Sequence, residues 1–238
     1  MAAGAMSGRV EGAGVELAYT SVGSGPATVV VHGMGGVPAV AGLPGRVIAY
    51  DRRGYGESGA PEPYVRTTVS EQAEDLACVI KRLEVVPALL VGHDLGALVA
   101  LDLLLRHGGL ARGAVLVDPP AYMFVAEATE ALSEERAALE DAVRSGGPAA
   151  GMAWWLDDRA RSGRESTRDA LAFFADYGAL ATLPLSYAAL LGVQTPVAVV
   201  TSPGAKEHDA AAAEALLDTL GNAHAATTLE EATRLTQL

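Results

Sequence analysis

The stretch VGHDLGALVALDLLL, residues 91–105, constrains the fold more than any other part of the chain. A short apolar run of strand length, ALLVG, leads into it, and a helical pattern that is apolar at nearly every position follows. Gly92 and Gly96 flank Asp94 at the spacing needed where a strand and a helix pack tightly around one exposed side chain. The sequence therefore predicts a sharp strand-to-helix turn that presents the Asp94 carboxylate.

Strands and helices alternate along most of the chain. We expect strands within the segments VELAYTS, ATVVVHGMGG, RVIAYDRRGYGESGAP, ALLVGHD, GAVLVDPP and TPVAVVTSPG. Helices are expected at SEQAEDLACVIKRL, with Ser70 as its cap, after the Asp94 turn, and at EHDAAAAEALLDTL. This alternation predicts an α/β fold with a mostly parallel sheet that is covered on both faces.

The pattern changes between residues 121 and 190, which are rich in helical segments and hold no strong strand. We expect a sheet core made of residues 1–120 and 191–238, interrupted by a helical cap at 121–190. The cap holds eight of the twelve aromatic residues: Tyr122, Phe124, Trp154, Trp155, Phe173, Phe174, Tyr177 and Tyr187. Because binding pockets favour aromatic linings, this concentration predicts a lid over a mostly apolar substrate.

Composition narrows the classes of partner. The formal net charge of −12 argues against binding to nucleic acid, which needs clustered Lys and Arg. The single cysteine, Cys78, excludes an intramolecular disulfide. The start, MAAGAMSGRV, lacks the charged and apolar regions of a signal peptide, and no apolar run reaches bilayer-spanning length. We therefore expect a cytoplasmic protein without membrane contact.

Three motifs in fixed order resemble those of the α/β-hydrolases. VVVHGMGG resembles the oxyanion loop of that family, YDRRGYGESGAP the loop that follows, and VGHDLGAL the nucleophile elbow. The helical insertion after LVDPP resembles the family's cap. Since Asp94 occupies the nucleophile position, the chain is most similar to the epoxide-hydrolase and haloalkane-dehalogenase branch, over nearly its whole length.

An aspartate at this position indicates a particular chemistry. A carboxylate that attacks an ester would form an anhydride, whereas attack on an sp³ carbon gives a stable alkyl ester. Water can then attack the ester carbonyl while backbone N–H groups hold the oxyanion. The resemblance assigns these donors to Met34 and Leu95.

The electrophile expected from the resemblance is an epoxide. Haloalkane dehalogenases usually follow the nucleophile with Trp and haloacetate enzymes with Arg, but here the residue is Leu95. Epoxide hydrolases polarise the ring oxygen with cap tyrosines, for which Tyr177 is the best candidate. Two departures are His-Gly-Met-Gly-Gly in place of His-Gly-x-Pro, and a loop before Arg46 too short for the usual helix. Further substrate contacts are expected from His32, Tyr122, Trp154 and Trp155.

The catalytic histidine and the catalytic acid of the family do not stand at their usual positions in this sequence. The family places a histidine after the last strand, where His224 is one candidate. If AHAATTLE is that strand, Arg234 takes the histidine's place, and arginine cannot serve as an ordinary base. Asp118 is the candidate acid, with the alternative that it only ends its strand.

Two other histidines, His93 and His208, follow or precede segments of the expected site. His93 is expected to point away from the site as a buried, hydrogen-bonded histidine, and His208 is a weak candidate for a replacement base. Glu207 and Asp209 suit the start of a helix, where acidic residues are common without catalysis.

Three hypotheses for the function follow. The first is an enzyme that opens an epoxide in a small, largely apolar metabolite, as in secondary metabolism. The second is a cyclase, isomerase or dehydratase in which Asp94 is a general acid or base. The third is a degenerate member that binds a ligand without turnover. In each case we expect a small-molecule partner, no cofactor and no metal, and a homodimer is a candidate assembly.

Overall fold

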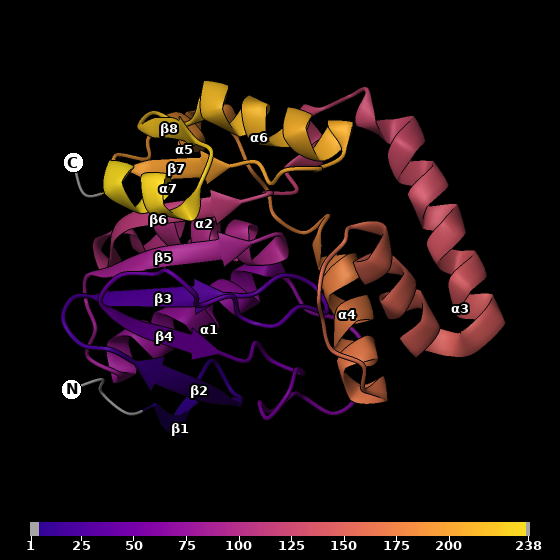
Figure 1. Ribbon diagram of the computed structural model, residues 1–238, viewed down its shortest axis with the longest axis horizontal. Helices are drawn as coiled ribbons and strands as arrows, with labels where there is room; N and C mark the ends of the chain where they lie inside the picture. Colours follow the sequence, from indigo (N-terminus) through magenta and orange to yellow (C-terminus); the bar gives the residue numbers. More distant parts are fainter. Residues whose placement is uncertain (1–4, 237–238) are drawn as a thin grey trace.

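The computed structural model describes residues 5–236, and its centre is an eight-stranded sheet with the order β1-β2-β4-β3-β5-β6-β7-β8 (Figure 1). Strand β2 pairs antiparallel with β1 and β4, and the remaining neighbours are parallel. The strands are β1 (Met6–Glu11), β2 (Glu16–Val22), β3 (Ala27–Val31), β4 (Arg46–Tyr50), β5 (Ala88–His93), β6 (Ala111–Val117), β7 (Val197–Val200) and β8 (Ala223–Ala226). The α/β class with a mostly parallel sheet is therefore confirmed.

Helices cover both faces of the sheet because its central strands are apolar on both sides. In β5, Leu90 belongs to the cluster that includes helices α1 and α2, whereas Leu89 and Val91 pack on the opposite face with helix α7. The helices are α1 (Val69–Arg82), α2 (Leu95–His107), α3 (Ala128–Asp158), α4 (Thr167–Ala179), α5 (Tyr187–Leu191), α6 (Glu207–Thr219) and α7 (Leu229–Leu235). Residues 33–45 contain no helix, as the short loop predicts.

Two details of the expected elements were wrong. Helix α1 begins at Val69, and its cap is Thr68, whose side chain accepts from the N–H of Glu71, rather than Ser70. Strand β1 was not expected, because it is mostly exposed and lies at the edge of the sheet. The first four residues of the MAAGAMSGRV start lie outside the described residues.

In the sequence, helices α3, α4 and α5 come between β6 and β7. Helices α3 and α4 stand at the end of the sheet to which the parallel strands point (Figure 1). Helix α3 consists of two limbs, because Gly147 has φ +77° and Pro148 follows it. Residues after α3 return to the core, where the N–H of Arg164 donates to the carbonyl of Gly35 at 2.8 Å. The cap therefore covers the carboxyl ends of the strands.

A buried ion pair joins the cap to the core. Arg52, in the loop after β4, lies 2.6 Å from Asp176 of α4, and these side chains are 1% and 0% exposed. Tyr55 donates its hydroxyl to Asp176 at 2.7 Å, and the Gln72 amide donates to the other carboxylate oxygen at 2.7 Å. Because every partner of Asp176 comes from the core, this cluster fixes where α4 docks.

Candidate active site

The strand-to-helix turn is built around Asp94, which lies between the last residue of β5 and the first residue of α2. Asp94 has φ +52°, a conformation that costs a non-glycine residue about 1–3 kcal/mol. A Cβ at Gly96 would overlap the carbonyl oxygens of Val31 and His32, and one at Gly92 would overlap that of Gly96. The two glycines therefore permit the close strand-to-helix packing that holds Asp94 in this strained position.

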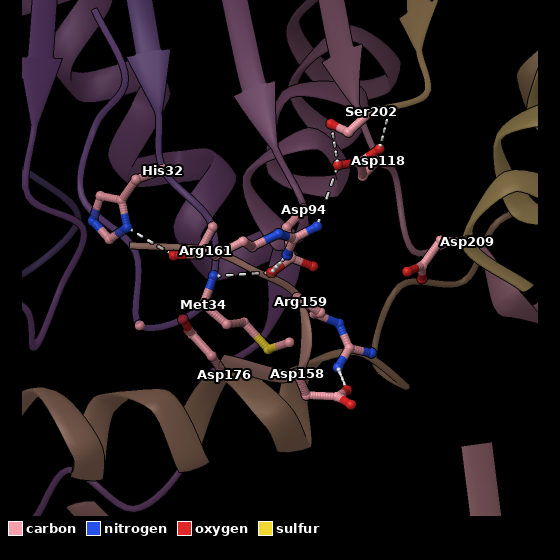
Figure 2. Close-up of polar contacts among 12 residues, drawn as sticks. His32, Met34, Asp94, Asp118, Asp158, Arg159, Arg161, Asp176, Ser202 and Asp209 are labelled. Carbon is pink, nitrogen blue, oxygen red and sulfur yellow. Dashed lines mark hydrogen bonds and ion pairs between the residues drawn. The ribbon is translucent and has the colours of Figure 1, made fainter. Parts of the chain in front are cut away.

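The Asp94 carboxylate is 4% exposed and is held through one oxygen. The N–H of Met34 donates to Oδ2 at 3.2 Å, and Nη1 of Arg161 lies 3.1 Å from the same atom (Figure 2). Among residues 5–236, no other group forms a hydrogen bond or ion pair with this carboxylate. Oδ1 is therefore left to react.

A second carboxylate, Asp118, follows β6 with φ +46° and lies in the same cavity. It accepts from the N–H of Ser202 at 2.8 Å and from the Ser202 hydroxyl at 2.7 Å. Nη2 of Arg161 lies 3.3 Å from its Oδ2, so Arg161 bridges Asp118 and Asp94 (Figure 2). The structure thus brings together the two aspartates singled out in the sequence.

Arg161 was missed by the sequence analysis. It lies in the loop after α3 and is 27% exposed, and no motif or periodicity distinguishes it from the neighbouring Arg159 and Arg164. The cavity that it shares with Asp94 has a volume of about 290 Å³. Its polar lining consists of His93, Asp94, Asp118, Arg161, Ser162 and Ser202.

Burial and charge act in opposite directions on Asp94. Burial raises the pKa of Asp94 above its ordinary value, while the positive charges of Arg161 and Arg159 and the Met34 N–H lower it in part. The net direction is upward. Arg161 is therefore the main cationic group that favours the ionised form.

The variant Arg161→Gln tests this balance. Without the positive charge at 3.1 Å, the pKa of Asp94 should rise further, so its titration midpoint should move to higher pH. The midpoint can be measured by ¹³C NMR of the labelled carboxyl group. Arg144→Gln, which removes an exposed cation of α3, is the control and should leave the midpoint unchanged. An unchanged midpoint in Arg161→Gln would contradict the contact.

Comparison with known proteins identifies the family. The sequence model described as alpha/beta hydrolase fold matches residues 26–157, which is more than half of the chain. The chain belongs to the alpha/beta hydrolase fold family. The matched region holds the strand-to-helix turn with Asp94.

Curated relatives match shorter stretches. "Bifunctional epoxide hydrolase 2" of Sus scrofa is 30% identical over 115 residues, which cover 45% of this chain and 21% of that protein. "Epoxide hydrolase" of Caballeronia sordidicola is 37% identical over 92 residues, which cover 35% of this chain and 28% of that protein. The match spans less than a third of either relative's length.

Solved structures agree on the fold alone. An esterase from Exiguobacterium antarcticum superposes with a TM-score of 0.70 at 19% identity, covering 94% of this chain and 91% of that one. Among residues 5–236, no helix is long and apolar enough to cross a membrane. The same residues form no cluster of side chains suited to hold a metal ion.

The cap aromatics lie around a second cavity. Tyr177, Trp155 and Tyr122 line a hollow of about 380 Å³, with Leu132 and Leu180 among its apolar neighbours. Asp94 is not part of its lining. The structure therefore places Tyr177 apart from the cavity of Asp94, and Tyr122 donates its hydroxyl to Asp209.

The remaining predicted contacts lie in the interior. Trp154 is half-buried on α3 and packs against the main core without lining either cavity. His32 is fully buried: its Nδ1 contacts the Gly33 carbonyl at 2.8 Å and its Nε2 accepts from the N–H of Arg52 at 3.0 Å. His32 thus holds the oxyanion loop and does not face a substrate. Leu95 is the first residue of α2, where backbone N–H groups have no partner within the helix.

Neither candidate for the family histidine reaches the elbow. His224 is exposed on β8, so AHAATT does contain the last strand. Arg234 lies exposed in the last turn of α7, and the segment EATRLTQL is helical rather than a catalytic loop up to its last two residues, which lie outside the described residues. Neither residue lines the cavity of Asp94, and which of them corresponds to the family's histidine stays a prediction.

The expectation for His93 was wrong. It lines the cavity of Asp94 and is half-buried, and its buried Nε2 has no hydrogen-bond partner among residues 5–236. His208, the weaker candidate, is buried 3.2 Å from Glu135, outside that cavity.

Proposed function

We propose that the protein is an epoxide hydrolase that forms a covalent ester on Asp94. The observation that carries this proposal is the state of the Asp94 carboxylate: Oδ2 is held by Met34 and Arg161, and Oδ1 is left free at the tip of the elbow. The two relatives named as epoxide hydrolases support it.

The first step is attack by Oδ1 on a ring carbon. A bond forms between Oδ1 and that carbon, the carbon–oxygen bond of the ring breaks, and the ring oxygen leaves as an alkoxide. Arg161 is the cationic donor that shares the cavity with Asp94, whereas Tyr177 lines the other cavity. Arginine keeps its own proton, so its guanidinium stabilises the alkoxide until the oxygen takes a proton from water.

The second step hydrolyses the ester. Water attacks Cγ of Asp94, and negative charge develops on the carbonyl oxygen of the ester. The N–H of Met34, at 3.2 Å from Oδ2, is positioned to stabilise that charge. Cleavage of the bond between Cγ and Oδ1 releases the diol and leaves Asp94 as a carboxylic acid that has gained one oxygen from water. Its proton neutralises the hydroxide left by the first step, which restores the carboxylate.

One observation favours a second candidate, a cyclase or isomerase in which Asp94 moves protons without forming an ester. Burial raises the pKa of Asp94, as a buried general acid or base requires. Such an enzyme would add no water to its product.

The test is incubation with a panel of aryl and alkyl epoxides, followed by the intact mass of the protein and analysis of the products in ¹⁸O-labelled water. The proposal predicts a diol, with an ester on Asp94 that rapid quenching traps. Consumption of an epoxide without incorporation of label would favour the second candidate. If no compound is consumed and no adduct forms, epoxide hydrolysis is contradicted.

A further inference from the structure

Hydrolysis of an ester on Asp94 requires a base for the attacking water, and four of the five histidines are not placed to supply it. His32 has both ring nitrogens engaged in the oxyanion loop. His107 contacts Glu74 at 3.0 Å at the far end of α2, and His208 is buried beside Glu135. His224 is exposed on the edge strand. The remaining histidine, His93, lines the cavity of Asp94.

The sheet explains why His93 reaches this cavity. It is the last residue of β5 and pairs with Val117, the last residue of β6. Side chains alternate along a strand, so His93 continues the row of Leu89 and Val91 on the face covered by α7. His93 stands at the carboxyl edge of the sheet and is half-buried, whereas the five preceding residues of β5 are buried.

The connection between β8 and α7 follows the last strand, where the family pattern places its histidine. It consists of Thr227 and Thr228, and both are engaged with the first turn of α7. The N–H and the hydroxyl of Thr227 donate to Glu231 at 2.9 Å, and the hydroxyl of Thr228 accepts from the N–H of Glu231. This connection brings no imidazole to the site.

The surroundings of His93 suit a base. Its Nε2 is buried and has no hydrogen-bond partner among the described residues, and an unsatisfied buried nitrogen costs about 1–3 kcal/mol. Burial lowers the pKa of His93, the charge of Arg161 lowers it further, and Asp118 opposes this in part. The ring is therefore neutral near neutral pH, with a nitrogen that can accept a proton.

We propose that His93 is the base that activates water for hydrolysis of the Asp94 ester, an inference that rests on the proposed function. The neutral imidazole, which lines the cavity, takes a proton from water as the water oxygen bonds to Cγ. When the bond between Cγ and Oδ1 breaks, the imidazolium returns that proton to the departing oxygen, and the diol leaves.

Formation of the ester removes one of the two carboxylate partners of Arg161. While Asp94 is a free carboxylate, its charge holds Nη1 of Arg161 at 3.1 Å, and Nε2 of His93 is buried. The ester carries no negative charge, so this attraction is lost after alkylation. Arg161 then keeps its contact with Asp118, whose Oδ2 lies 3.3 Å from Nη2, and remains in the cavity that His93 lines.

The test compares His93→Gln with the wild type in single-turnover reactions with styrene oxide, quenched in acid and followed by intact mass. Two rates are read: formation of the Asp94 adduct and its decay. His93→Gln should form the adduct at the wild-type rate and lose it about 10²–10⁴ times more slowly, the usual contribution of a general base. His224→Gln is the matched control and should leave both rates unchanged.

A merely structural role is separated by rescue. Imidazole added to His93→Ala should restore decay of the adduct, with a pH dependence that follows imidazole, and this also decides the matter if His93→Gln does not fold. Wild-type decay in His93→Gln, or a permanent adduct in the wild type, would overturn the role of His93 while leaving Asp94 as nucleophile. A wild type that forms neither adduct nor diol would overturn the proposed function itself.

Discussion

Asp94→Asn is expected to reduce the rate of epoxide consumption by at least about 10⁴-fold, the scale seen when the nucleophile of a covalent catalyst is removed. An amide has no anionic oxygen to attack the ring carbon, so the adduct should disappear as well. The measurement is the initial rate of diol formation together with the intact mass of the protein.

The loss should not come from unfolding. Since burial raises the pKa of Asp94 in the folded protein, ionisation of this group disfavours the folded state. Its contribution to stability is present at low pH and is lost as the pH rises between the unfolded and the folded pKa. Asn carries no charge, so the variant should be at least as stable as the wild type at neutral pH.

Asp102→Asn is the matched control. Asp102 is a buried carboxylate on α2 that lines neither the cavity of Asp94 nor that of the cap aromatics. Its replacement should leave diol formation near the wild-type rate. A reduction equal to that of Asp94→Asn would show that any buried charge change on this helix disturbs the site, and would remove the support for Asp94.

Asp176→Asn should lower the free energy of unfolding by about 3–5 kcal/mol, because it leaves the buried Arg52 guanidinium without its counter-charge. The amide also places an NH₂ group at one of the two oxygen positions, where either Tyr55 or Gln72 donates a hydrogen bond. Urea unfolding of the wild type and the variant measures the difference.

Two comparisons distinguish charge burial from other causes. Asp141→Asn removes an exposed partner of Arg144 and should cost at most about 1 kcal/mol. The double variant Arg52→Met/Asp176→Leu removes both charges and should cost less than Asp176→Asn alone. If Asp176→Asn unfolds at the same urea concentration as the wild type, the ion pair does not hold the cap to the core.

Local patterns were sufficient to predict the sheet core and the elbow. A strand followed by Gly92, Asp94 and Gly96 specifies its own geometry, because the close backbone approach at the two glycines is encoded within a few residues. Asp118 could be found for the same reason, since it directly follows the apolar strand β6.

The rest of the site depends on how distant segments dock. Arg161 reaches Asp94 only because the cap folds back over the sheet, and the anchor between Arg52 and Asp176 joins residues 124 positions apart. Nothing near these residues in the sequence marks their partners. His93 was misjudged because the cavity that it lines is completed by distant residues, Arg161 and Ser162 after α3 and Ser202 after β7.

The most direct test of the account is a single turnover in ¹⁸O-labelled water, with enzyme in excess over the epoxide, followed by mass analysis of the peptide that contains Asp94. A covalent ester hydrolysed at Cγ predicts that label enters the Asp94 carboxylate and that the diol of this first turnover is unlabelled. Label in the diol with none in Asp94 would mean that water attacks the epoxide directly, and would contradict Asp94 as the nucleophile.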